Sequence, residues 1–223
     1  MLNTQSATIY SLAEPMHGGR FTSVLSVGSR KFGHECSVCG FRESERVYPL
    51  RIRWTVEEWG PGSDVIPDFN WPRAHQILLV SQLVRDYLQE RVTGIRFGAV
   101  EMVDDPTLHR PKRITKRTKK RVWLPYEGPP LHEIIVDKVV HLDIERSGRT
   151  FTLCPGCGRK QFKVRHDAQD IVPRSEWTGE DFFRIDENGG ADGPVFVTQH
   201  ARDLLKAGRF TNLSIRRCGA IVP

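Results

Sequence analysis

The chain has 223 residues, of which 39% are hydrophobic, and it carries 33 Lys and Arg against 27 Asp and Glu. This apolar content is sufficient for a packed core and excludes a wholly disordered chain. No apolar run approaches the roughly 18 residues of a membrane span, and the first 15 residues lack the pattern of a signal peptide. Five cysteines without a secretion signal argue against a disulfide framework. We therefore expect a soluble, cytoplasmic protein that does not associate with a membrane.

Short apolar runs predict strands along the whole chain. In the first half they lie at 21–27, 47–54, 77–80 and 95–103. In the second half they lie at 122–126, 134–144, 161–164, 195–197 and 210–215. Ser81 and Thr198 each follow a strand, where the hydroxyl is placed to cap a helix. Gly94 and Gly208 lie near the ends of these helices, where a positive φ is often needed. The mixture predicts an α+β protein rich in sheet.

One segment carries the excess positive charge. Between residues 110 and 121 the chain has eight basic residues and no acidic one, namely Arg110, Lys112, Arg113, Lys116, Arg117, Lys119, Lys120 and Arg121. Such a strip attracts phosphates or an acidic protein face in a salt-sensitive way. The alternative is a solvated loop whose charges keep a strand edge from pairing. Trp123 and Tyr126 follow the strip, but no aromatic residue lies inside it to stack on a base, which weakens the case for nucleic acid.

The sequence contains an internal repeat with a period of about 118 residues. The pentapeptide CSVCG that begins at Cys36 recurs as CPGCG at Cys154, an offset of 118, and residues 79–88 recur at 196–205, an offset of 117. Two separate motifs that keep nearly the same spacing are hard to attribute to chance. The repeat therefore predicts two related, sheet-rich lobes, each with a strand–helix–strand unit, at residues 1–118 and 119–223.

Each C-x-x-C-G motif is suited to bind zinc. The two-residue gap lets both thiolates reach one ion at about 2.3 Å, and the glycine permits a tight turn whose N–H groups can hydrogen-bond the sulfurs. Two such pairs complete a tetrahedron of four thiolates, which is the usual closed structural site. We therefore predict one structural zinc ion in a split, zinc-ribbon-like site that joins the lobes. Its ligands are Cys36, Cys39, Cys154 and Cys157.

Other readings of the reactive residues are weaker. The cysteine pairs are separated by 114 residues, against about 15–20 in an ordinary ribbon, and the alternative is two independent redox dithiols. A reactive C-x-x-C normally begins a helix, and no helical pattern follows either motif. His34 is an alternative ligand but is better interpreted as a neighbour of the site, and Cys218 as a small packed residue. No catalytic motif is present and four thiolates leave no position for a reactive water, so we expect no enzyme activity.

These motifs resemble the double-CXXCG proteins of myxobacteria. The similarity rests on the two CXXCG motifs, the apolar lead-in at 21–34, the segment Asp181–Ile185 and the tail at 195–215, and it spans about Arg20 to Val222. Members of that family include immunity proteins that protect a cell against a toxin passed between siblings by contact. The resemblance implies a non-catalytic, cytoplasmic protein that binds and neutralises one cognate toxin.

The candidate partner-binding surface comes from charge and residue type. The resemblance supplies no toxin-contacting residues, so the basic strip at 110–121 with Trp123 and Tyr126 is our candidate, because these residue types are enriched at binding hot spots. The alternative function is a nucleic-acid-binding zinc-ribbon protein that uses the same strip on phosphates.

Overall fold

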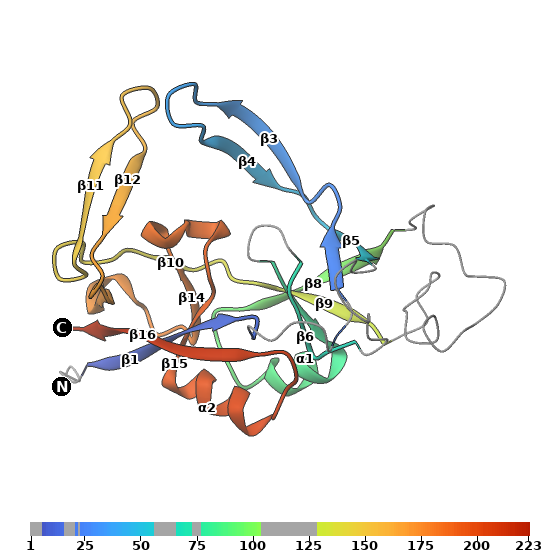
Figure 1. The fold of residues 1–223 in the computed structure, drawn as a ribbon. Helices are drawn as coiled ribbons and strands as arrows, with labels where there is room; N and C mark the ends of the chain where they lie inside the picture. Colours follow the sequence, from blue (N-terminus) through green and yellow to red (C-terminus); the bar gives the residue numbers. More distant parts are fainter. Residues whose placement is uncertain (1–5, 16–20, 22, 56–65, 73–76, 104–128) are drawn as a thin grey trace.

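The computed structural model describes residues 6–15, 21, 23–55, 66–72, 77–103 and 129–223 (Figure 1). Within these residues strands predominate, and only two α-helices accompany them, so the predicted sheet-rich α+β class is confirmed. No helix in the described ranges is long and apolar enough to cross a membrane. The strand predicted at 122–126 lies outside the described residues.

Two six-stranded sheets form the body of the described molecule. The first has the order β2 (Ser23–Ser26), β5 (Leu50–Thr55), β8 (Arg96–Met102), β9 (Leu131–Ile135), β7 (Leu78–Ser81) and β6 (Phe69–Asn70). The second has the order β10 (Val139–Val140), β14 (Phe182–Ile185), β15 (Phe196–Thr198), β1 (Ala7–Ala13), β16 (Ser214–Val222) and β13 (Asp170–Pro173). The run β6-β7-β9-β8-β5 matches the run β14-β15-β1-β16-β13 in order and in strand direction.

The two sheets exchange their central strands. β9 comes from the second half of the chain but lies between β7 and β8 of the first sheet, with Leu131 opposite Ser81. β1 comes from the first half but lies between β15 and β16 of the second sheet, with Ile9 opposite Thr198. Neither sheet is therefore built from one half of the chain alone.

The two helices begin where the sequence predicts. α1 (Gln82–Leu88) is capped by the Ser81 hydroxyl, and α2 (Gln199–Ala207) by the Thr198 hydroxyl. Three short 3₁₀ turns complete the fold, namely η1 (Arg174–Glu176), η2 (Asp186–Asn188) and η3 (Gly190–Asp192). Both α-helices bury one face in a single core cluster that also receives Leu12 and Ile134 from the exchanged strands. Figure 1 places both at the end of the molecule opposite β3, β4, β11 and β12.

Asp181 links the two halves beside α2. Its carboxylate accepts hydrogen bonds from the backbone N–H of Thr93 at 3.1 Å and from the Thr93 hydroxyl at 3.3 Å. It also accepts one from the Thr198 hydroxyl at 2.7 Å, so it holds the residue that caps α2. Asp181 thus bridges two segments that are 88 residues apart in the sequence.

Asp68 makes the matching link beside α1. Its carboxylate accepts hydrogen bonds from the N–H and the hydroxyl of Thr211, at 2.9 and 2.8 Å, and from the Ser81 hydroxyl at 3.1 Å. Gly94 and Asn212, which follow the two bridging threonines, both adopt a positive φ, of 84° and 59°. The same local geometry thus occurs on both sides of the molecule.

The expectation for the two helix-end glycines is half right. Gly94 has the expected positive φ, whereas Gly208 ends α2 with a right-handed φ of −67°. The left-handed residue there is Arg209, with a φ of 52°. The expectation for Gly208 is therefore wrong, because the left-handed conformation that follows α2 is adopted one residue later.

Replacing Asp181 by Ala tests this link. We expect the free energy of unfolding to fall by about 2 kcal/mol, because the Thr93 and Thr198 donors lose a charged acceptor. Urea unfolding measures the change. Asp167→Ala, which removes an exposed ion pair with Arg165, is the control and should change stability by less than about 0.5 kcal/mol. Equal effects of the two substitutions would contradict a linking role for Asp181.

Candidate metal centre

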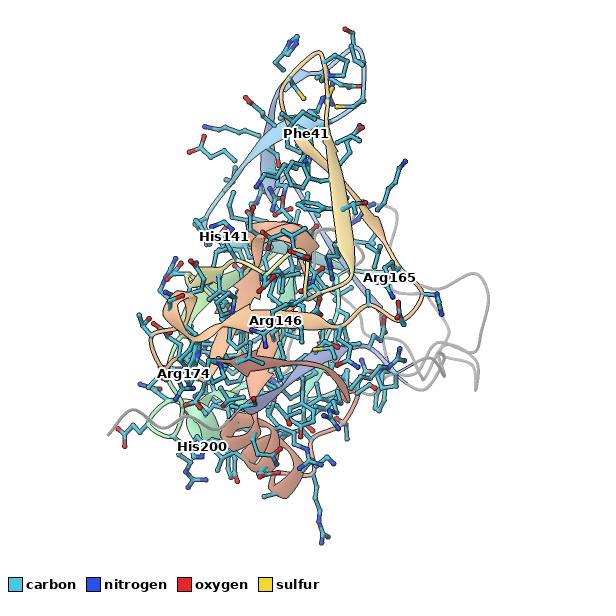
Figure 2. All side chains as sticks on the ribbon, turned by 90° about the vertical axis from the view of Figure 1, so that its left-hand side faces the viewer. Phe41, His141, Arg146, Arg165, Arg174 and His200 are labelled. Atoms are coloured by element: carbon cyan, nitrogen blue, oxygen red, sulfur yellow. The ribbon has the colours of Figure 1, made fainter. Side chains whose placement is uncertain are left out.

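Two hairpins project from the sheets and meet at their tips. The first consists of β3 (Arg30–Glu35) and β4 (Arg42–Arg46), and the second of β11 (Arg149–Leu153) and β12 (Lys160–Val164). Each carries its C-x-x-C-G motif in the turn. Figure 1 shows the two tips side by side, and Figure 2 shows sulfur atoms gathered at this end of the molecule, near Phe41.

The four predicted cysteines come together at this point. The Sγ atoms of Cys36 and Cys154 are 3.8 Å apart, and those of Cys39 and Cys157 are 3.7 Å apart. All four Sγ atoms lie within 4.8 Å of one another. A tetrahedron with metal–sulfur bonds of 2.3 Å has edges of about 3.8 Å, whereas a disulfide requires about 2.0 Å. The cysteines are thus free thiols in an arrangement that can hold one metal ion.

Both turns are built by the same backbone hydrogen bonds. In the first, the N–H of Gly40 donates to the carbonyl of Cys36 at 2.8 Å, and the N–H of Cys36 donates to the carbonyl of Phe41 at 2.8 Å. In the second, the N–H of Gly158 donates to the carbonyl of Cys154 at 2.8 Å. Gly40 and Gly158 have φ angles of 67° and 71°, in the left-handed region that favours glycine. This explains the glycine that follows each second cysteine.

Backbone N–H groups lower the pKa of the first cysteine of each motif, Cys36 and Cys154. The N–H groups of Cys39 and Val38 lower the pKa of Cys36 to about 6. The N–H of Cys157, with that of the residue before it, likewise lowers the pKa of Cys154. Hydrogen bonds to the charged form favour the thiolate, which is the form that ligates a metal.

The second cysteine of each motif, Cys39 or Cys157, has a raised pKa instead. We call these two the outer cysteines. The N–H of Arg159 lowers the pKa of Cys157, but desolvation and the neighbouring cysteines outweigh it and raise that pKa to about 12. The pKa of Cys39 is also raised, since desolvation and its cysteine neighbours outweigh the hydrogen bond from Phe41. Four thiolates repel one another when no cation lies among them, so a metal ion would release the protons that the outer pair retains.

The tips are packed against each other at Gly156. A Cβ atom there would lie 2.8 Å from Cγ2 of Val38 and 3.0 Å from Sγ of Cys36. Gly156 therefore gives the first hairpin room to approach the second. Sequence reasoning assigned no packing role to this residue, although it occupies the repeat position of Val38.

The hairpins also carry an apolar and basic surface that sequence reasoning missed. Among the described residues, the large hydrophobic side chains that are exposed here are Phe32, Val38, Phe41, Tyr48, Phe151, Leu153 and Val164, and Leu83 is the other one. Cationic groups lie over all four of these aromatic rings. Arg42 lies over Phe32, Arg159 over Phe41 and Lys160 over Phe151, and both Arg46 and Arg96 lie over Tyr48. We call these exposed faces of β3–β4 and β11–β12 the hairpin surface. Basic and apolar residues alternate along these strands, as in KQFKV at 160–164. This alternation is the sequence signal from which the hairpin surface could have been predicted.

A groove of about 580 Å³ runs along the second hairpin beneath the metal centre. Its walls include Phe41, Arg159, Lys160 and Phe162. The groove thus combines aromatic rings with positive charge. Phe151 and Phe162 extend this aromatic group, with ring centroids 5.9 Å apart.

The remaining candidates lie elsewhere. His34 is exposed on β3 and is not part of the ligand group. Cys218 lies partly buried on β16, where desolvation raises its pKa to about 12, as expected for a packed residue. The basic strip at 110–121 lies outside the described residues, together with Trp123 and Tyr126.

A second group with metal-ligand chemistry was not predicted. His141, Asp186 and Glu187 place their ligand atoms within 4.8 Å of one another. Glu187 Oε2 already accepts a hydrogen bond from the N–H of Leu142 at 2.9 Å, and its Oε1 lies 3.4 Å from His141 Nδ1. The contacts of His141 with the two carboxylates explain why these three side chains lie close together.

Comparison with known proteins adds no identification. No protein-family model matches the chain, and no curated protein matches it either.

Substitution of Gly156 by Ala tests the packing of the tips. We expect affinity for Co²⁺, used as a spectroscopic probe of thiolate ligation, to fall about tenfold, because the new methyl group pushes Val38 and Cys36 away. Gly33→Ala, where a Cβ would lie 3.5 Å from its nearest neighbour, is the control. Adding Val38→Ala to Gly156→Ala should restore part of the affinity. Wild-type affinity in Gly156→Ala would contradict close packing of the tips.

Proposed function

We propose that this protein is an immunity protein that binds and neutralises a cognate bacterial toxin. The observation that carries the proposal is the hairpin surface, in which exposed aromatic and cationic side chains are presented by two hairpins that meet at one metal centre. Large exposed apolar side chains concentrated in one region are typical of a protein-interaction site. The toxin as partner comes from the resemblance to the double-CXXCG proteins.

The charge of the second hairpin favours an acidic partner. Residues 149–165 include five basic residues and no acidic one, namely Arg149, Arg159, Lys160, Lys163 and Arg165. Complementary charge accelerates association and selects the partner. The basic strip at 110–121 would add to this field, so both basic segments favour the acidic face of a toxin.

We assign zinc to the four cysteines. Thiolate ligands favour soft or borderline metals, and a closed set of four cysteines is typical of structural zinc. In this proposal the two duplicated lobes, 1–118 and 119–223, each contribute half of a split zinc ribbon. The ion has a structural role, since all four of its coordination positions are filled by sulfur. The protein then acts in the cytoplasm as a binding protein and not as an enzyme.

The second candidate function is nucleic-acid binding. It is favoured by the groove along the second hairpin, where Phe41 and Phe162 lie with Arg159 and Lys160. Aromatic rings that stack on bases, next to cations that contact phosphates, are typical of single-strand binding. This candidate predicts binding that weakens steeply with salt, whereas an immunity protein needs no nucleic acid.

Co-purification with the product of a neighbouring toxin gene tests the immunity proposal. We expect a stable complex and protection of cells that express the toxin. The double substitution Lys160→Glu and Lys163→Glu should weaken the complex at least about tenfold, because it reverses the charge of the second hairpin. Neutralising Lys116 to Arg121 should weaken it as well.

The control for this experiment is Lys206→Glu. Lys206 is exposed on α2, at the end of the molecule away from the hairpins (Figure 1), so its reversal should leave binding unchanged. No binding and no protection with any neighbouring toxin would contradict the immunity proposal. A salt-sensitive gel shift with RNA or DNA, lost in the same double variant, would favour the second candidate.

Metal analysis tests the zinc assignment. We expect one zinc ion per chain, and a strong chelator should lower the melting temperature because metal binding contributes to folding stability. Cys157→Ser should lose the zinc and the same stability. Cys218→Ala, which removes the cysteine outside the cluster, should keep one zinc ion. Unchanged thermal stability in Cys157→Ser would contradict a structural role for the metal.

A further inference from the structure

The second hairpin has one strand edge that no other described strand covers. β12 pairs with β11 on one side, and none of the described strands pairs with it on the other side. β12 is also the strand of this hairpin that lies toward the first hairpin (Figure 1). An edge strand presents a row of backbone N–H and C=O groups, which makes it a template for a further strand.

The register of the hairpin identifies the backbone groups that face outward. The N–H of Cys154 donates to the carbonyl of Arg159 at 2.9 Å, and the N–H of Arg165 donates to the carbonyl of Gly148 at 3.1 Å. Hydrogen-bonded and non-hydrogen-bonded pairs alternate in an antiparallel ladder. Between these two hydrogen-bonded pairs, alternate residues of β12 therefore direct their N–H and C=O groups away from β11. These residues are Lys160, Phe162 and Val164.

The groove beside the second hairpin follows this outward edge. All three residues whose backbone groups face outward line it, and the tip of the first hairpin and the turn η2 form its other walls. Its volume is about 580 Å³. The hydrogen-bonding groups of the edge thus open into a space that can hold a further segment of chain.

One face of the second hairpin is apolar and largely exposed. Residues opposite each other in the ladder share a face, as do alternate residues along a strand. Leu153 and Val164 are 60% and 57% exposed, and Phe151 is 42% exposed. Apolar side chains that an added strand carries on this face would extend it and cover part of it. The face consists of Phe151, Leu153, Phe162 and Val164.

The opposite face of the hairpin is polar, and the whole segment is positively charged. Residues 149–165 include five basic residues and no acidic one, and Lys163 lies on the polar face. Glu187 is the acidic residue in the groove wall. Its side chain is 3% exposed and accepts a hydrogen bond from the N–H of Leu142 at 2.9 Å, so it offsets little of this charge. Complementary charge therefore favours an acidic segment in the groove.

These features distinguish between the possible occupants of the edge. A second copy of β12 would bring its own lysines against Lys160 and Lys163, and like charges oppose such pairing. A nucleic acid can use the aromatic rings and the cations, but its phosphates offer no donor to the outward carbonyls. An extended peptide offers donors and acceptors in the same alternation as the edge itself.

We propose that β12 accepts an added strand from its partner, an extended segment in which acidic and apolar residues alternate. The backbone of this segment pairs with the outward groups of β12. Its apolar side chains continue the face of Phe162, and its acidic side chains continue the face of Lys163. Main-chain hydrogen bonds then supply affinity, and the alternation supplies specificity. The proposal deepens the immunity function and rests on it only for the identity of the partner as a toxin.

Binding of synthetic peptides to the full chain tests the proposal. The probe is a peptide slightly longer than β12 in which glutamate and valine alternate strictly. We expect saturable binding by calorimetry, at least about tenfold tighter than for two control peptides. One control has lysine in place of glutamate, and the other has the glutamates and valines in two separate blocks. Absence of saturable binding, or equal binding of either control, would overturn the proposal. Tighter binding of a single-stranded oligonucleotide would overturn it in favour of nucleic acid.

Amide hydrogen exchange measured by NMR locates the added strand. On saturation with the acidic peptide, the N–H groups of Lys160, Phe162 and Val164 should exchange at least about tenfold more slowly. Those of Gln161 and Lys163 already face β11, so their exchange should change little. Equal protection of all five amides, or no protection of the outward ones, would overturn the assignment of an added strand to this edge.

The substitution Val164→Pro removes one outward N–H group and keeps a small apolar side chain. Proline is tolerated on an edge strand where the missing N–H faces solvent. We expect Val164→Pro to bind the acidic peptide at least about threefold more weakly than Val164→Ala, the matched control that keeps the N–H. Equal binding by the two folded variants would overturn the proposal. If Val164→Pro fails to fold, the exchange pattern of the wild-type protein decides the question.

The result can be separated from the test of the immunity function. A toxin that co-purifies with the protein, together with failure of the acidic peptide to bind, would overturn the added strand and leave the immunity function standing. Peptide binding with the expected exchange pattern, in the absence of any toxin partner, would support the added strand and leave the immunity function contradicted.

Discussion

The exchange of central strands between the two sheets is the constraint on which the rest of the structure depends. β1 and β9 each lie in the middle of a sheet whose other long strands come from the opposite half of the chain. Leu12 on β1 and Ile134 on β9 bury in the same core cluster, and each such side chain stabilises the folded state by about 1.5–3 kcal/mol. The halves therefore fold as one body. This body fixes the bases of the two hairpins relative to each other without the help of a metal ion.

A metal ion bound by the four cysteines would replace the core that the hairpins lack. Most residues of β3, β4, β11 and β12 are exposed, and an isolated two-stranded hairpin is marginally stable in water. Bonds from four cysteines to one ion would order both tips at once, at the far end of each ribbon from the sheets. In this arrangement the outer faces of the hairpins do not need to pack against other elements. It accounts for aromatic side chains such as Phe32 and Phe151 standing in solvent beside cations.

The features that could be predicted from the sequence are those with a local cause. Ser81 and Thr198 cap their helices because a hydroxyl at that point accepts a hydrogen bond from the first turn. The four cysteines could be assigned to one site because the C-x-x-C-G motif occurs once in each half of the chain. β1 was not predicted, since only Ile9 and Leu12 of its seven residues are buried and no alternation marks it. The exchange of β1 and β9 depends on contacts between residues far apart in the sequence, so neither strand carries a local sequence signal for it. A cavity at the base of the first hairpin was missed for a similar reason, because the residues that line it are spread from Arg30 to Asp192.

Agreement and difference between the two halves separate structure from specific chemistry. The aspartate links, the helix caps and the cysteine turns occur twice with nearly the same geometry, which is expected of contacts that the fold needs in both places. The buried ion pair between Arg46 and Glu133 occurs once, since these two residues lie where the other half has Val164 and Ser11. Burying such charges costs stability unless they are compensated, and the second half shows that the strands form without them. The ion pair therefore belongs to the specific chemistry of the first half of the chain and not to the requirements of the shared fold.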